Sequence, residues 1–94
     1  MSGAERYERC SSRFGAAEMD GETVLMDLDT GKLMSFQGSG VEVWRLIECG
    51  ASVDEIVQEL TAMFAVERAV AADDVRLFLG ELVARGLAQI VPVG

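Results

Sequence analysis

The chain has 94 residues, half of them apolar and one of them proline, which suits a single globular domain with a modest core. Its 16 acidic and 8 basic residues give a formal net charge of −8, which opposes binding to nucleic acid or any other polyanion. Histidine is absent, so the commonest general base and a common metal ligand are excluded.

The first twelve residues mix charged and small polar side chains without a period, and they predict a flexible N-terminal tail before one domain over residues 13–94. This tail lacks the apolar segment of a signal peptide, and no apolar run approaches the roughly 20 residues of a membrane span. We therefore expect a cytoplasmic protein, in which a disulfide between Cys10 and Cys49 is not favoured.

Three segments predict a small antiparallel sheet. Arg13–Met19 and Thr23–Leu28 are separated by Asp20-Gly21, a strong signal for a two-residue hairpin. Leu33–Phe36 returns after Asp29-Thr30-Gly31, where Asp can bond nearby backbone and Gly can take a positive φ. Three strands joined in this way are the smallest sheet with reasonable independent stability.

A helix is expected over Gly40–Cys49, because Gly38-Ser39-Gly40 ends the strand and Ser39 is a good N-cap. The polar residues of this helix lie on one narrow stripe. The remaining positions are apolar and include the only tryptophan, Trp44, which predicts a central, buried helix.

Two further helices follow. Ser52–Glu55 reads S-x-x-E, a capping box that opens the second helix. After a connection over residues 65–70, the third helix is expected over residues 71–85, with Gly86 ending it. Residues 87–91 predict a short final strand. Together these elements predict an α+β domain, a winged helix-turn-helix with an N-terminal three-stranded antiparallel sheet followed by three helices.

The third helix has two distinct faces at 100° per residue. One is the core stripe Val75, Phe78, Leu79 and Leu82. The opposite face is unusual for a solvent face, because it combines one large apolar residue with two small ones among acids. Its members are Asp73, Leu77, Gly80, Glu81 and Ala84.

Two classes of function are disfavoured by the residues present. The chain has no Gly-x-Ser-x-Gly elbow and no complete phosphate loop, so we expect no catalytic residues, no metal site and no cofactor. The helix-turn-helix would present Asp54, Glu55 and Asp73 to DNA, where carboxylates repel phosphates.

Peptide binding is the class of function that these residues do not disfavour. An exposed strand edge is a template for a strand from another chain, and the second face of the third helix would form the other wall of a groove. The alternative is that Met34 and Phe36 are ordinary core and that Leu77 is a lone exposed leucine. The candidate peptide-binding residues are Lys32, Leu33, Met34, Ser35, Phe36, Asp73, Arg76, Leu77, Gly80, Glu81 and Ala84.

Residues 21–87 contain, in order, the segments V-L-M-D-L-D-T-G-K-L-M-S-F, G-S-G-V-E-V-W-R-L-I, S-V-D-E-I-V-Q-E-L and V-R-L-F-L-G-E-L-V-A-R-G-L. This ordered set resembles the PqqD family, also called RiPP recognition elements, which bind peptides in ribosomal peptide natural-product pathways. The resemblance departs at Gln37, where the family often has Asn, and at Leu33, where an aromatic residue is common.

The resemblance implies a protein without activity of its own that binds the leader of a precursor peptide. The leader would add as a strand to Leu33–Phe36 and lie against Asp73–Arg85. The partner would be a separate maturation enzyme, either a radical enzyme with an iron–sulfur cluster, as in PQQ biosynthesis, or a leader protease of a lasso-peptide pathway. The alternatives are a winged-helix regulator and a structural protein that forms homodimers by strand exchange.

Overall fold

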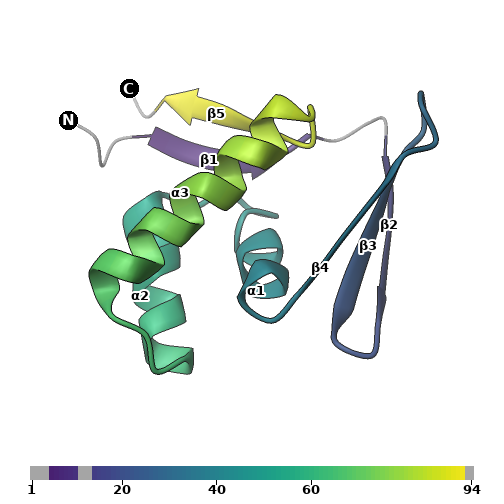
Figure 1. Cartoon of the computed structure of the whole chain (residues 1–94). Coiled ribbons are helices and arrows are strands. Elements are labelled where there is room, and N and C mark those ends of the chain that lie inside the picture. The colour runs from purple at the N-terminus through teal and green to yellow at the C-terminus, as the bar shows by residue number, and fades with distance from the viewer. Residues whose placement is uncertain (1–4, 11–13, 93–94) are drawn as a thin grey trace.

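Three α-helices and five β-strands form the part of the chain that the computed structural model describes, residues 5–10 and 14–92 (Figure 1). All strand pairs are antiparallel, which confirms the expected mixed α+β class. The elements are β1 (Glu5–Arg9), β2 (Phe14–Met19), β3 (Glu22–Asp27), β4 (Leu33–Gln37), α1 (Ser39–Leu46), α2 (Val53–Met63), α3 (Arg68–Ala84) and β5 (Ala88–Pro92).

The strands form two sheets that lie on different sides of the helices (Figure 1). β2, β3 and β4 pair in that order, which confirms the predicted three-stranded sheet, and β1 pairs with β5 in a two-stranded sheet. The prediction of a flexible tail over residues 1–12 is therefore wrong for Glu5–Arg9. Its other residues, except Cys10, lie outside the described part. The strand was missed because its partner comes from the far end of the chain.

Both predicted hairpin turns are present. Asp20 (φ 53°) and Gly21 (φ 78°) connect the facing residues Met19 and Glu22, as a two-residue turn with positive φ at both positions requires. In the second turn the carboxylate that bonds the backbone belongs to Asp27, whose Oδ1 accepts from the N–H groups of the loop residues 29 and 30. These turns fix the register that leaves β4 at the edge of the sheet.

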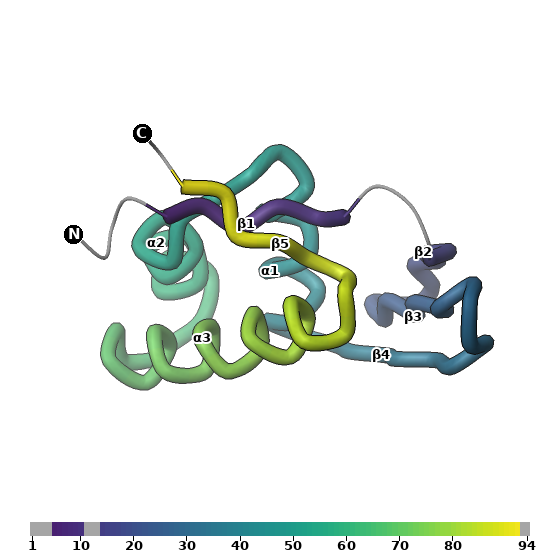
Figure 2. The backbone as a smooth tube through the Cα atoms, turned by 90° about the horizontal axis from the view of Figure 1, so that it is seen from above, coloured from purple at the N-terminus to yellow at the C-terminus, as the bar shows by residue number. Residues whose placement is uncertain are grey.

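The first helix begins one residue earlier than expected, at Ser39, and its N-cap is Gly38 with φ 62°. The prediction of Ser39 as N-cap is wrong, because a glycine in the left-handed region turns β4 directly into the helix. α1 also ends at Leu46, before the expected Cys49. Figure 2 shows β4 running straight from the sheet into α1.

The other helix ends follow their local signals more closely. The predicted capping box is confirmed: Ser52 Oγ accepts from the Glu55 N–H at 3.2 Å, and Glu55 Oε1 accepts from the Ser52 N–H at 2.9 Å. α3 starts at Arg68, before the expected residue 71, and residues 68–70 form its first turn. It ends at Ala84, and Gly86 (φ 75°) then donates its N–H to the Val83 carbonyl while Leu87 donates to the Leu82 carbonyl, in a Schellman arrangement.

Trp44 is the centre of the core and is 1% exposed. Phe14 and Phe36 of the larger sheet meet its ring edge-to-face, with centroid distances of 5.4 and 6.1 Å. Arg9 of β1 places its guanidinium carbon 4.3 Å from the ring centroid and donates from Nε to the Trp44 carbonyl at 2.9 Å. One residue of α1 thus holds both sheets to the helices.

The buried face of α3 covers this core. Val75, Leu79 and Leu82 of the expected core stripe are buried, whereas Phe78 is only half-buried. None of the helices in the described part combines the length and the hydrophobicity needed to cross a bilayer.

Candidate functional site

β4 is an edge strand. It pairs with β3 along one side, and no strand in the described part of the chain pairs with its other side. The Asp27 N–H donates to the Lys32 carbonyl at 2.9 Å, and hydrogen-bonded pairs alternate along an antiparallel ladder. The register therefore turns the backbone groups of Leu33, Ser35 and Gln37 toward the open side. These groups are a template for an added strand.

An aromatic contact joins β4 to α3. The rings of Phe36 and Phe78 meet edge-to-face with centroids 5.1 Å apart. Gly40 of α1 permits this approach, because a Cβ added there would lie 3.2 Å from the Phe36 Cβ. Two hollows lie along β4, one near each of its ends.

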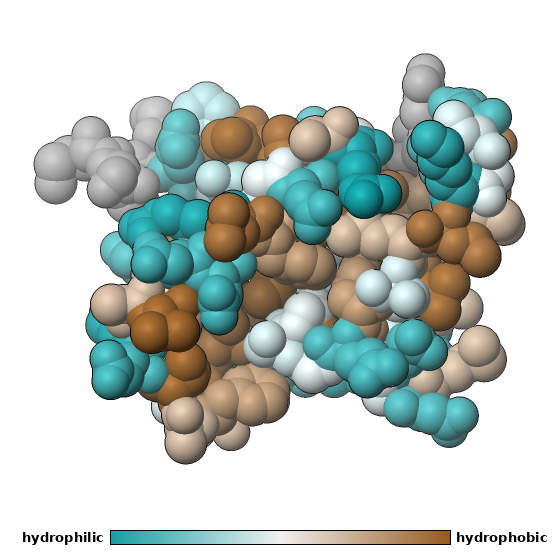
Figure 3. Space-filling view, in the orientation of Figure 1, coloured by the Kyte–Doolittle hydropathy of each residue, from teal (hydrophilic) through white to brown (hydrophobic). Residues whose placement is uncertain are grey.

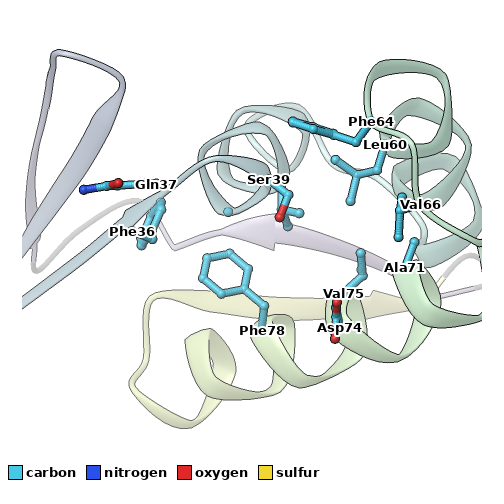
Figure 4. A pocket seen from close by; sticks show the side chains of 12 residues that line it. Phe36, Gln37, Ser39, Leu60, Phe64, Val66, Ala71, Asp74, Val75 and Phe78 are labelled. Carbon is cyan, nitrogen blue, oxygen red and sulfur yellow. The ribbon is translucent and has the colours of Figure 1, made fainter.

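The larger hollow has a volume of about 460 Å³ and lies where β4, α1, α2 and α3 meet (Figure 4). We call it the apolar hollow, because most of its lining is aliphatic or aromatic and its one charged lining residue is Asp74. Apolar side chains also gather across the middle of this face of the molecule in Figure 3. The lining comprises Phe36, Gln37, Ser39, Gly40, Val43, Leu60, Phe64, Val66, Ala71, Asp74, Val75 and Phe78.

The smaller hollow has a volume of about 220 Å³ and lies between the start of β4 and the C-terminal end of α3. We call it the charged hollow, because three of its eight lining residues carry charge. Its lining comprises Leu25, Asp27, Thr30, Lys32, Leu33, Met34, Arg85 and Leu87.

Four of the five candidate residues from the strand segment line these hollows. Phe36 lines the apolar hollow, and Lys32, Leu33 and Met34 line the charged hollow. Ser35 lines neither, since its side chain is exposed and its backbone faces the open edge. Met34 and Phe36 are half-buried and pack on the core, so each serves the fold as well as the surface.

The candidate residues from the third helix are placed differently. All of them are exposed and none lines either hollow, with Leu77 73% exposed. They cover the part of α3 away from the core. They are Asp73, Arg76, Leu77, Gly80, Glu81 and Ala84.

Among the lining residues that the sequence analysis did not select for the site are Asp74 and Phe78 of α3 and Arg85, which directly follows α3. At 100° per residue these three positions fall within about 40° of one another on the helix surface. That shared direction was a usable signal. It was passed over because Phe78 was assigned to the core and the opposite face was more unusual in composition.

The groups with shifted pKa values support the scaffold. The backbone N–H of Ser52, followed by the charge of Arg6, lowers the pKa of the Glu55 carboxyl. Burial lowers the pKa of Arg9, which packs on Trp44. Within the described residues, no three His, Cys, Asp or Glu side chains are grouped as metal ligands would be.

The chain is similar to a known protein family and to solved structures. Residues 22–88 match the family described as coenzyme PQQ synthesis protein D (PqqD). The structure of TbiB1 in complex with the TbiA(beta) leader peptide is similar with a TM-score of 0.78 and 32% identity, covering 87% of this chain and 94% of that one. The structure of lasso peptide synthetase B1 complexed with the leader peptide has a TM-score of 0.78 and 23% identity, covering 88% and 96% of the two chains. No curated protein matches the chain.

Proposed function

The chain belongs to the PqqD family, and from this membership and the open edge of β4 we propose that it is a non-catalytic peptide-binding protein. It captures the leader segment of a ribosomally synthesised precursor peptide. It then presents the precursor to a separate maturation enzyme, either a radical enzyme or a leader protease of a lasso-peptide pathway.

The observation that carries this proposal is the unpaired edge of β4 with a hollow near each end. An extended peptide satisfies the outward N–H and C=O groups of Leu33, Ser35 and Gln37 by adding as a strand. Every second side chain of that peptide then faces α3, where the two hollows accept the larger ones. Main-chain bonds provide affinity and the hollows provide selectivity.

We further interpret the helices as a winged helix-turn-helix used for peptides. α2 and α3 pack against each other and are joined by a short connection, and the β1–β5 pair flanks them as a wing (Figure 1). Asp54 and Asp73 remain exposed on these helices, as carboxylates that disfavour a DNA contact.

The protein assists the maturation enzyme by raising the local concentration of the precursor at the enzyme's active site. A leader held on β4 tethers the rest of the precursor near the active site of the maturation enzyme, so the second encounter becomes intramolecular. A free leader loses conformational entropy when it is ordered, which opposes binding. A groove already formed in the free protein, as the Phe36–Phe78 contact indicates, keeps the protein's own share of that cost small.

The test is a backbone-amide NMR titration with a candidate leader peptide from the same gene cluster. We expect saturable shifts along residues 32–37 and on the α3 residues that line the hollows. An unrelated peptide of equal length and charge is the control. Absence of any saturable shift with the cognate leader would refute the proposed function.

A pair of variants then decides which side of α3 the leader touches. Phe78→Ala removes a lining ring from the apolar hollow, whereas Leu77→Glu alters the outer face. If the leader lies in the groove, Phe78→Ala weakens binding more than ten-fold, which is more than about 1.4 kcal/mol. A larger loss in Leu77→Glu would move the contact to the outer face predicted from the sequence.

A further inference from the structure

The charged hollow concentrates positive charge on an otherwise acidic protein. Lys32 is the only lysine of the chain, and no ion pair of its side chain is found among the described residues. Arg85 is half exposed, and its nearest carboxylate, Glu81, is at 3.7 Å, longer than a direct hydrogen bond. Both cations line the same small hollow.

Asp27 is the only acid among the described residues that line this hollow, and it already accepts hydrogen bonds. Its Oδ1 accepts backbone N–H groups of the hairpin loop at 2.8 and 3.2 Å. The lining therefore carries one net positive charge, with the donors of Lys32 and Arg85 able to turn toward a ligand. A carboxylate is the side chain that such donors hold best, because charge-assisted hydrogen bonds are stronger than neutral ones.

The apolar hollow has the opposite preference. Asp74 is the only charged residue among the described residues of its lining, and the rest of the surface is dominated by aliphatic and aromatic groups such as Phe36, Phe64 and Phe78. A ligand carboxylate placed there would lose water and face Asp74. An apolar or aromatic ligand side chain is favoured instead.

The strand geometry sets the distance between the two positions. Lys32 of the charged hollow and Phe36 of the apolar hollow are four residues apart. At about 3.3 Å per residue this is roughly 13 Å along the strand. Because side chains alternate, the ligand residues opposite Lys32 and Phe36 lie on the same face of an added strand, four positions apart.

We propose that the leader carries an acidic side chain four positions from its apolar anchor, and that Lys32 and Arg85 bind this carboxylate. The inference rests on the proposed function and adds the recognition pattern of that site. The two hollows differ in charge and size, so they also fix the register of the leader on β4, because a shift along the strand would put the acid in the apolar hollow.

The first test measures the affinity of the fluorescently labelled leader encoded beside this gene for single variants at low salt. Lys32→Glu is expected to weaken binding about ten-fold or more, because attraction becomes repulsion in the hollow. Arg85→Gln should weaken it by a smaller factor. Arg68→Glu is the matched control, because it makes the same charge change at an exposed position that lines neither hollow.

The second test exchanges the charges. Each acidic residue of the leader is replaced by lysine in turn, and each peptide is titrated against the wild-type protein and Lys32→Glu. One position should weaken binding to the wild type and restore it to Lys32→Glu, and that position should lie four residues from the apolar anchor. Thermal unfolding of each variant verifies that the fold is kept.

The outcomes separate the two proposals. If the wild type binds the leader and Lys32→Glu binds it equally well, the acidic contact is refuted while leader binding stands. If Lys32→Glu and Arg68→Glu weaken binding equally, the effect is general electrostatics and the assignment to the charged hollow fails. If the wild type does not bind the leader at all, the proposed function itself fails.

Discussion

Single side chains at the junction of β4 and α1 connect the core of this protein to its groove. Phe36 contacts Trp44 on its core side and Phe78 on its groove side, so a ligand in the apolar hollow would rest on the core itself. Gly40 keeps that junction tight, since its missing Cβ leaves room for the Phe36 side chain. The floor of the hollow is therefore rigid, while its rim at Ser39 is exposed.

Filling the apolar hollow from its rim should block binding without damage to the core. Ser39→Trp adds a large ring at an exposed position that lines the hollow. We expect the dissociation constant of the leader to rise at least ten-fold and the far-UV circular dichroism spectrum to stay unchanged. Val70→Trp places the same side chain at a half-exposed position outside both hollows and should bind normally. Unchanged affinity in Ser39→Trp would show that the leader does not use this hollow.

The capping box of α2 gives the fold a pH-dependent contribution. The Ser52 N–H lowers the pKa of Glu55 below its usual 4.5, so the charged carboxylate stabilises the folded state above that value. This stabilisation is lost as pH falls from about 4.5 through the lower pKa of the folded state. Glu55→Gln should therefore flatten the stability curve in that range, as measured by urea unfolding between pH 3 and 6. Glu59→Gln, on the same helix, is the control.

Ser52→Ala removes the other half of the box and should lower the free energy of unfolding by about 1 kcal/mol at neutral pH. Ser52→Thr keeps the hydroxyl and should recover most of that loss. If Ser52→Ala and Ser52→Thr lower the free energy of unfolding equally, the loss comes from changed packing at this buried position and not from the missing cap.

At the scale of elements, local signals predicted structure where the determining contacts are local. The Asp20-Gly21 turn and the capping box at Ser52 depend on residues within three positions, and both are confirmed. The strand Glu5–Arg9 was missed because its stabilising partner, β5, lies at the other end of the chain. Ser39 was mistaken for a cap because the sequence does not reveal that Gly38 adopts a positive φ.

The candidate site shows the same division. The edge strand was found from its short apolar pattern and its turns. The side of α3 that meets it depends on how the helix is rotated over the core, and that rotation is set by packing of Val75, Leu79 and Leu82. Phe78 could be read from sequence as apolar, but its position between core and groove required the tertiary structure.

The open edge of β4 can be tested with a proline. Ser35 directs its backbone N–H to the open side, so Ser35→Pro removes a donor for the added strand and leaves the bonds to β3 in place. We expect the leader affinity to fall more than ten-fold, while the unfolding temperature changes little. Ser35→Ala keeps the N–H and should bind like the wild type. Normal binding by Ser35→Pro would exclude strand addition in this register.

At the scale of the whole molecule, the β1–β5 sheet joins the two ends of the chain and locks them onto the helices. Tyr7 exchanges backbone hydrogen bonds with Ala51 at 2.8 and 3.0 Å, and Arg6 bonds both the Gly50 carbonyl and Glu55. Figure 1 shows this sheet above the helices, whereas β4 lies to their right. It therefore serves the scaffold without lining either hollow.

Arg9 provides the last test, because it separates the stability of the scaffold from the function of the groove. Arg9→Ala removes the stacking on Trp44 and the bond to its carbonyl, and it should lower the free energy of unfolding by about 1 to 2 kcal/mol. Urea unfolding measures this loss. Arg9→Lys keeps the charge but not the planar stack, so it should recover only part of it.

Leader affinity should remain within about two-fold of the wild type in both Arg9 variants, measured by calorimetry well below the unfolding temperature. This expectation follows because the edge-to-face contact of Trp44 with Phe36 does not involve Arg9. A large loss of affinity with the fold intact would mean that the β1–β5 sheet reaches the groove through Trp44. In that case the scaffold and the binding surface would act as one coupled unit rather than as support and site.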